Sequence, residues 1–135
     1  MDELEEIRAR KMREFFQKQN VVQVIVEAGD SNFNEEVLQR SNKTPVVVDF
    51  WSPLCLPCTL LGPILEKLAK ERKGEFVLAK VNVDANPRIS QVFRVSAIPS
   101  VKMFKNGVVA GGFVGALGEP SVQQWLNANL NGQNG

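Results

Sequence analysis

The sequence predicts an α/β domain with a central mixed five-stranded sheet, four flanking helices and an additional N-terminal helix. Apolar segments of strand length alternate with helical segments over most of the chain, which is typical of parallel strand pairs. The pair Asn106 and Gly107 then predicts a tight hairpin near the end. The 135 residues, 44% of them apolar, suffice for one core. We expect a helical extension over residues 1–20, the domain over 21–131 and a frayed tail over 132–135.

The composition argues against several kinds of partner. A net charge of +1 without a basic patch gives no reason to expect a nucleic acid or an anionic membrane. No apolar stretch approaches the roughly 20 residues that cross a bilayer. The chain opens with Asp2 and Glu3 and shows no secretory signal, so we expect a cytoplasmic protein. We also expect a monomer.

The N-terminal extension carries the pattern of a capped helix. Asp2 and Glu5 have capping-box spacing, which predicts a helix from Asp2 to Gln19. Its apolar residues fall near one stripe, so we expect this helix to pack on its own domain. A dimer contact and a partner-binding helix are the alternatives.

The first half of the domain has the pattern of strand, helix and strand. The β-branched segment Val21–Glu27 predicts the first strand, and Ser31 or Asn32 then caps a short helix that reaches about Arg40. The segment Val46–Trp51 is apolar almost throughout, which indicates a central strand covered on both faces.

A helix, a strand and a short helix follow. A regular apolar face predicts a helix over Thr59–Lys70, with a kink at Pro63. Phe76–Val83 predicts the next strand. Asn86 and Pro87 then begin a short helix, since proline suits a first helical turn.

The chain ends in a hairpin and a helix. The hairpin strands are expected over Val101–Phe104 and Val108–Phe113, on either side of the tight turn. A last helix begins at Glu119 or Ser121 and continues to about Leu130.

The two cysteines of the chain, Cys55 and Cys58, stand between a predicted strand and a predicted helix. The first turn of a helix has unpaired N–H groups and the positive end of the helix dipole, which lower the pKa of a thiol. We expect Cys55 to lie nearer that end and to be more exposed, with Cys58 one turn further in. This arrangement suits attack of Cys55 on a disulfide, followed by displacement by Cys58.

Two charged residues interrupt predicted strands. Asp49 lies in a buried strand, where a carboxyl group has a raised pKa and can exchange a proton with a thiol. The alternative is a position with water access and no role. Lys80 lies in the next strand, and a lysine there commonly extends to the margin of the sheet.

The sequence contains few residues of the kinds that form a structural metal site. It contains no histidine, and two cysteines fall short of the four ligands of a structural zinc site. A metal shared between two chains through Cys55 and Cys58 remains as a hypothesis. Otherwise we expect no cofactor beyond the cysteine pair itself.

Several blocks of sequence together resemble the thioredoxin family from about Val22 to Leu130. They are spread across the domain, which makes the resemblance specific. The blocks are Val48–Trp51, Cys55–Cys58, Pro63–Leu65, Ala79–Asp84, Ile98–Pro99, Phe104–Gly107 and Val114–Leu117.

This resemblance implies the thioredoxin fold and protein disulfide reductase activity, with Cys55 as the nucleophile and Cys58 as the resolving thiol. It implies that Asp49 assists the deprotonation of Cys58 and that Lys80 modulates Asp49. Protein disulfides are then the substrates. A reductase of the thioredoxin-reductase type is then the electron donor.

The resemblance also implies a docking surface for substrate around Cys55. The peptide bond between Ile98 and Pro99 is expected to be cis and to face the cysteines. The backbone beside it pairs with an extended substrate segment. The docking residues implied are Trp51, Leu54, Leu56, Pro57, Ile98, Pro99 and Gly115.

The chain departs from the family pattern beside the cysteines. Leu54 stands where the family has tryptophan, and Leu56 replaces a glycine, which removes backbone freedom and adds apolar bulk. These changes leave two alternatives to a reductase. One is a binding or chaperone-like module, and the other is a redox protein with the potential of an oxidase or isomerase.

Overall fold

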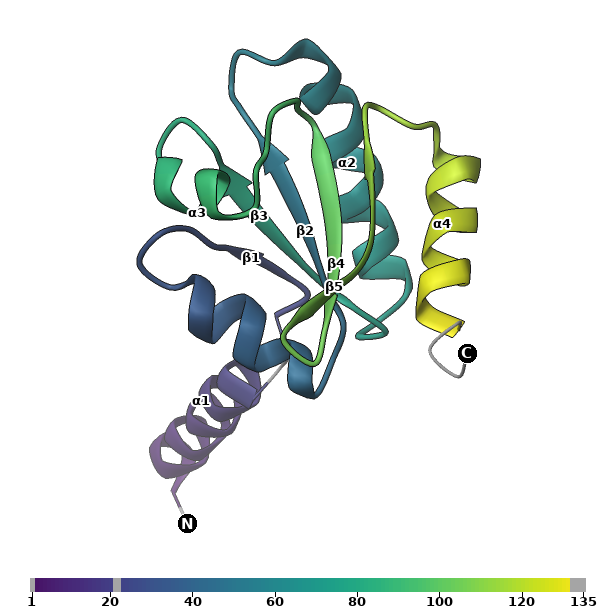
Figure 1. The fold of residues 1–135 in the computed structure, drawn as a ribbon. Helices are drawn as coiled ribbons and strands as arrows, with labels where there is room; N and C mark the ends of the chain where they lie inside the picture. The colour runs from purple at the N-terminus through teal and green to yellow at the C-terminus, as the bar shows by residue number, and fades with distance from the viewer. Residues whose placement is uncertain (1, 21–22, 132–135) are drawn as a thin grey trace.

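The computed structural model describes residues 2–20 and 23–131. Five strands form one sheet, and the helices other than the N-terminal one lie around it, as the sequence predicts (Figure 1). In chain order the elements are α1 (Glu3–Asn20), β1 (Ile25–Glu27), the π-helical turn η1 (Asn34–Gln39), the 3-10 turn η2 (Arg40–Asn42), β2 (Val46–Trp51), α2 (Leu56–Glu71), β3 (Val77–Asn82), α3 (Pro87–Val92), β4 (Ser100–Lys105), β5 (Val108–Val114) and α4 (Glu119–Asn131).

The sheet is mixed, with the strand order β1-β3-β2-β4-β5. Strands β1, β3 and β2 are parallel, whereas β4 is antiparallel to β2 and to β5. The register pairs Asp49 with Lys80 on β3 and Phe50 with Ser100 on β4. The carboxyl end of β2 therefore lies beside the start of β4, and both the cysteine segment and the Ile98–Pro99 segment are at this end.

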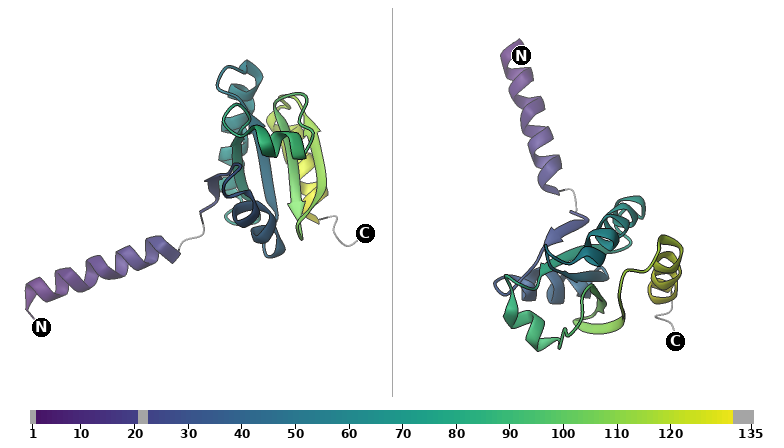
Figure 2. Two further views of the ribbon diagram at one scale, coloured as in Figure 1. Left: turned by 60° about the vertical axis from the view of Figure 1, so that its left-hand side comes forward. Right: turned by 90° about the horizontal axis from the view of Figure 1, so that it is seen from above.

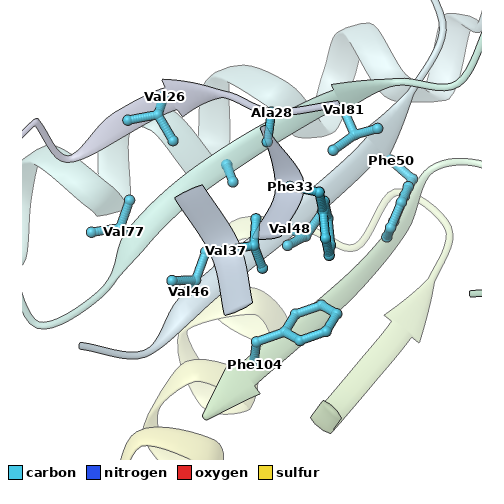
Figure 3. Packing of buried hydrophobic residues seen from close by; sticks show 11 residues of the cluster. Val26, Ala28, Phe33, Val37, Val46, Val48, Phe50, Val77, Val81 and Phe104 are labelled. Atoms are coloured by element: carbon cyan, nitrogen blue, oxygen red, sulfur yellow. The ribbon is translucent and has the colours of Figure 1, made fainter. Parts of the chain in front are cut away.

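Strand β2 is buried from Val46 to Phe50, because helices cover both faces of the sheet. On one face, α2 and α4 pack on a cluster that includes Val47, Leu78 and Val101. On the other face, η1 and α3 cover alternate residues of the same strands, and Figure 3 shows this second cluster. Since side chains alternate along a strand, Asp49 shares the α2 face with Val47.

The predicted hairpin is confirmed between β4 and β5. Asn106 and Gly107 have φ angles of +52° and +80°, and two successive positive φ angles are those of a type I′ turn. The register shifts between Met103 and Phe104, where β5 carries one extra residue.

The first strand and the first short helix differ from the prediction. Strand β1 begins at Ile25, and Val21 and Val22 lie outside the described residues. Neither Ser31 nor Asn32 caps η1, because Asn32 Oδ1 accepts a hydrogen bond from the N–H group of Gly29 instead. A local turn thus uses the side chain that we assigned to the helix.

Helix α1 is capped as expected but does not lie on the domain. The N–H group of Glu5 donates to Asp2 Oδ1 at 2.8 Å. Figure 2 shows the helix extending away from the sheet, and Leu4 and Met12 are exposed. The expectation that α1 packs on its own domain is therefore wrong for this structure. Within the described part of the chain, no helix is both long and apolar enough to cross a membrane.

Candidate active site

Cys55 and Cys58 form a disulfide at the N-terminus of α2. Cys55 is the residue that caps this helix, with an extended backbone, and its Sγ accepts a hydrogen bond from the N–H group of Cys58 at 3.2 Å. Cys55 is partly exposed, whereas Cys58 is 4% exposed. The two cysteines of the disulfide therefore differ in exposure, with Cys55 the more exposed residue.

Helix α2 begins three residues earlier than the predicted start at Thr59. Its first residue is Leu56, and Pro57 follows within the first turn. Proline suits the first turn because it has no N–H group, and the N–H groups of a first turn have no partner within the helix. The Cys55 sulfur accepts a hydrogen bond from one of these N–H groups, that of Cys58. Cys55 thus lies directly at the positive end of the helix dipole, where a thiolate is stabilised.

The segment between β2 and α2 is tied to the segment after β3. Ser52 is buried, and its hydroxyl group donates to Asp84 Oδ2 at 2.6 Å. The N–H group of Val83 donates to the carbonyl of Trp51 at 2.9 Å, and that of Cys55 donates to Ser52 at 3.1 Å. These bonds hold the residues that lead to Cys55 against the sheet.

Asp49 is a buried carboxyl group on the face of the sheet that α2 covers. It is 1% exposed, and its Oδ1 atom has no hydrogen-bond partner among the described residues. Burial raises the pKa of Asp49 to about 6, because it penalises the charged form; the charge of Lys80 lowers this pKa and that of Glu66 raises it. Asp49 therefore changes protonation in the neutral range, as a proton acceptor for a thiol requires.

Lys80 lies beside Asp49 in the sheet, but its ion pair is with another residue. Lys80 Nζ lies 3.1 Å from Glu66 Oε2 of α2 and 5.2 Å from the centre of the Trp51 ring. The lysine is partly buried rather than extended into solvent at the sheet margin. Its charge is therefore shared between a carboxylate and an aromatic face.

The peptide bond between Ile98 and Pro99 is cis, as the resemblance implied. The N–H group of Gly115 donates to the carbonyl of Pro99 at 2.8 Å, and Gly115 has a φ angle of +100°. Strand register therefore brings Pro99 and Gly115 together at the end of the sheet from which the cysteine segment leaves.

The leucines beside the cysteines are on the surface. Leu54 is 96% exposed and Leu56 is 73% exposed, and Leu60 lies one helical turn after Leu56 and is also exposed. Pro57 is exposed as well, while Trp51 and Ile98 are partly buried. The residues on either side of Cys55 in the chain therefore present apolar side chains to solvent.

Two site residues escaped the sequence reasoning. Glu66 lies eight residues after Cys58 and four after Gly62, so the three residues lie along one side of α2. This four-residue spacing is the feature of the sequence that could have indicated Glu66. Ser52 had no comparable signal, because its partner Asp84 is distant in the sequence. Within the described ranges, no cluster of three or more Cys, Asp or Glu residues suited to a metal ion is found.

Comparisons with known proteins agree on one family. A family model described as thioredoxin matches residues 24–128. A thioredoxin of Buchnera aphidicola subsp. Acyrthosiphon pisum is 36% identical over 107 residues, which cover 79% of this chain and 97% of the relative. Thioredoxins of Rickettsia felis and Chlorobaculum thiosulfatiphilum are 38% and 39% identical, cover 75% and 77% of this chain, and are each matched over 94% of their own length.

Proposed function

Because this chain belongs to the thioredoxin family, we propose that Cys55 is its attacking thiolate and Cys58 its resolving thiol in the reduction of protein disulfides. The chain is a disulfide oxidoreductase that works by dithiol–disulfide exchange through this pair. The observation that supports the assignment of roles is the difference in burial between the two cysteines of one disulfide. An accessible sulfur can meet a second protein, and a covered one can only react afterwards.

The reaction consists of two exchanges. The Cys55 thiolate attacks one sulfur of a substrate disulfide, which forms a mixed disulfide and releases the other substrate sulfur as a thiolate. Cys58 then loses its proton and attacks the Cys55 sulfur, which closes the Cys55–Cys58 disulfide and releases the second substrate thiolate. Two electrons pass to the substrate, and the protein leaves the reaction oxidised.

Asp49 accepts the proton of Cys58, directly or through a water molecule. Its position on the face under α2, its burial and its pKa of about 6 support this role. Lys80 modulates the affinity of Asp49 for that proton, since it is the neighbouring cation in the register. The cysteine pair itself carries the electrons, so the proposed reaction uses no further cofactor.

Substrate docks on the surface around Cys55. The backbone beside cis-Pro99 receives an extended segment of the substrate, and Gly115 lies next to it through its bond to the Pro99 carbonyl. The exposed side chains of Leu54, Leu56 and Pro57 contact the residues that flank the substrate cysteine, with Trp51 and Ile98 at the edge.

The oxidised protein is reduced again by another protein. Family membership implies reductase partners in general, and we propose an electron donor of the thioredoxin-reductase type. We also propose a cytoplasmic location and a monomer. The division into an extension over 1–20, a domain over 21–131 and a tail over 132–135 is part of the same proposal.

Reduction of a protein disulfide by dithiothreitol, with catalytic amounts of this chain, tests the assignment. We expect Cys55→Ser to abolish the acceleration and Cys58→Ser to accumulate a mixed disulfide that non-reducing electrophoresis detects. Asp49→Asn should retain the exchange but slow it at neutral pH. A mixed disulfide trapped by Cys55→Ser instead would reverse the two roles.

A further inference from the structure

The buried carboxyl group of Asp49 lacks the partner that the sheet register offers it. Asp49 and Lys80 are paired residues on adjacent strands, and their side chains share the face that α2 covers. Yet Asp49 Oδ1 has no hydrogen-bond partner in residues 2–20 and 23–131, and the ammonium group of Lys80 lies 3.1 Å from Glu66. Within the described part of the chain, the ion pair of Lys80 is therefore the one with the helix.

The position of Glu66 follows from the row that it forms with Cys58 and Gly62. Residues four apart lie on one side of a helix, so Glu66 is two turns below Cys58, about 12 Å along the axis. A Cβ atom added to Gly62 would lie 3.8 Å from both Glu66 Oε2 and Lys80 Nζ. The ion pair thus lies against the glycine, on the same row of the helix as the resolving cysteine.

The other residues near Lys80 give its ammonium group no reason to lie closer to Asp49. Trp51 receives the ammonium group on its ring face, and the exposed Glu27 is the register partner of Lys80 on β1, away from β2. Glu27, Trp51 and Lys80 also line a recess of about 360 Å³. On the side of β4, the register partner of Asp49 is the apolar residue Val101.

We propose that Glu66 is a positioning residue: it holds the ammonium group of Lys80 against α2 and so leaves the buried carboxyl group of Asp49 free to accept a proton. Were Lys80 to pair with Asp49 instead, the carboxylate would be stabilised in its charged form and would be a weaker base. Glu66 also raises the pKa of Asp49 by its own negative charge, which acts in the same direction.

This inference rests on the proposed role of Asp49 and adds a residue that tunes it. Glu66 lies two helical turns from Cys58 and pairs with Lys80, so its substitution should alter the pH at which Asp49 titrates rather than the identity of the reacting groups. Glu66 and Lys80 are both partly exposed, so the protein should tolerate a neutral isosteric residue at position 66.

Carboxyl NMR titration of Asp49 in the oxidised full chain tests the proposal, because it requires no turnover. In Glu66→Gln the pKa of Asp49 should fall by roughly half a unit to one unit, since a like charge is removed and Lys80 is released. In Lys80→Met this pKa should rise. In the double variant the change caused by Glu66→Gln should be clearly smaller, because no cation remains to be released.

Glu71→Gln is the matched control, since Glu71 lies on the same helix and pairs with Lys67 at 3.9 Å. It should leave the titration of Asp49 unchanged. Glu66→Asp keeps the negative charge, so it should lower the pKa of Asp49 by less than Glu66→Gln does. An unchanged Asp49 pKa in Glu66→Gln would overturn the proposal. It would also be overturned if Glu66→Gln shifted the Asp49 pKa equally in the parent protein and in Lys80→Met.

The rate of disulfide reduction separates this inference from the function on which it rests. We expect the pH profile of reduction by Glu66→Gln to move to lower pH together with the Asp49 titration, with a loss of about twofold to fivefold at neutral pH. If Glu66→Gln shifts the Asp49 titration but leaves the pH profile of disulfide reduction unchanged, the positioning role of Glu66 is supported. The same result would count against Asp49 as the proton acceptor.

Discussion

Ser52 donates a 2.6 Å hydrogen bond to Asp84, which joins the segment leaving β2 to the segment leaving β3. Ser52 is buried and stands three residues before Cys55. The bond therefore connects the start of the cysteine segment to a neighbouring strand, and it forms only when β2 and β3 have paired.

Ser52→Ala should lower the free energy of unfolding by about 1 to 2 kcal/mol, because alanine cannot make the hydrogen bond that the buried Ser52 hydroxyl donates to the Asp84 carboxylate. Urea unfolding measures this change. Ser121→Ala, at an exposed serine in the first turn of α4, is the control and should change stability by less than about 0.5 kcal/mol. Equal effects of the two substitutions would show that the Ser52 bond contributes nothing.

The pKa of Asp49 makes the stability of the oxidised protein depend on pH. This pKa is about 6 in the folded chain against an ordinary 3.8, so between these values the folded state binds one proton more than the unfolded state. The free energy of unfolding therefore falls as pH rises through this window, by about 3 kcal/mol in all. Asp49→Asn should lack this fall.

Urea unfolding at pH 4 and at pH 7.5 provides the measurement for Asp49. From the lower to the higher pH, the stability of Asp49→Asn relative to the parent protein should improve by about 2.4 kcal/mol, because pH 4 already lies slightly above the ordinary pKa of 3.8. Both proteins are kept oxidised, so that neither cysteine titrates. Parallel pH dependence of the two proteins would contradict the raised pKa.

Gly115→Ala should destabilise the loop that contacts cis-Pro99. The φ angle of Gly115 is +100°, which residues with a Cβ atom rarely adopt, so we expect a cost of about 1 to 3 kcal/mol. Gly118→Ala is the matched control, because an added Cβ atom there would lie 3.9 Å from Pro120 Cδ, an ordinary contact. Thermal or urea unfolding should distinguish the two variants, and equal stability would contradict the strain.

Leu54→Ser and Leu56→Ser should alter substrate use without altering the fold. Both side chains are largely exposed, so each change in stability should stay below about 0.5 kcal/mol. If the leucines contact substrate, kcat/KM for a protein disulfide should fall about threefold to tenfold, from the lost burial of an apolar side chain. Val108→Ser, at the other end of the sheet, should change neither quantity. Unchanged kcat/KM in both leucine variants would remove them from the docking surface.

Much of the fold could be predicted because its signals are local. The apolar run of β2 predicts a strand buried on both faces, and Asn106 and Gly107 predict the turn between β4 and β5 from their tolerance of positive φ angles. The spacing of Cys55 and Cys58 at a strand-to-helix junction predicts a redox pair. Each of these signals depends on residues that are neighbours in the chain.

Two of the errors arose where a local hydrogen bond of one side chain decided how an element begins. Asn32 can cap a helix or close a turn, and the structure shows that it closes the turn. The apolar periodicity predicted the start of α2 at Thr59, whereas the sulfur of Cys55 accepts a bond that begins the helix at Leu56. The packing of α1 on the domain could not be decided from its apolar stripe, which only indicates that one face differs from the other.

The sequence by itself determined the reacting groups, because thiol chemistry needs only Cys55 and Cys58 at the end of a strand and the start of a helix. It also identified Asp49 as a carboxyl group in a buried strand. The tertiary structure alone decided which charges surround Asp49, since Lys80 and Glu66 come from different elements and meet only when α2 packs on the sheet. The electrostatic energy of a buried group depends on distances through space, and such distances are absent from the order of residues along a chain.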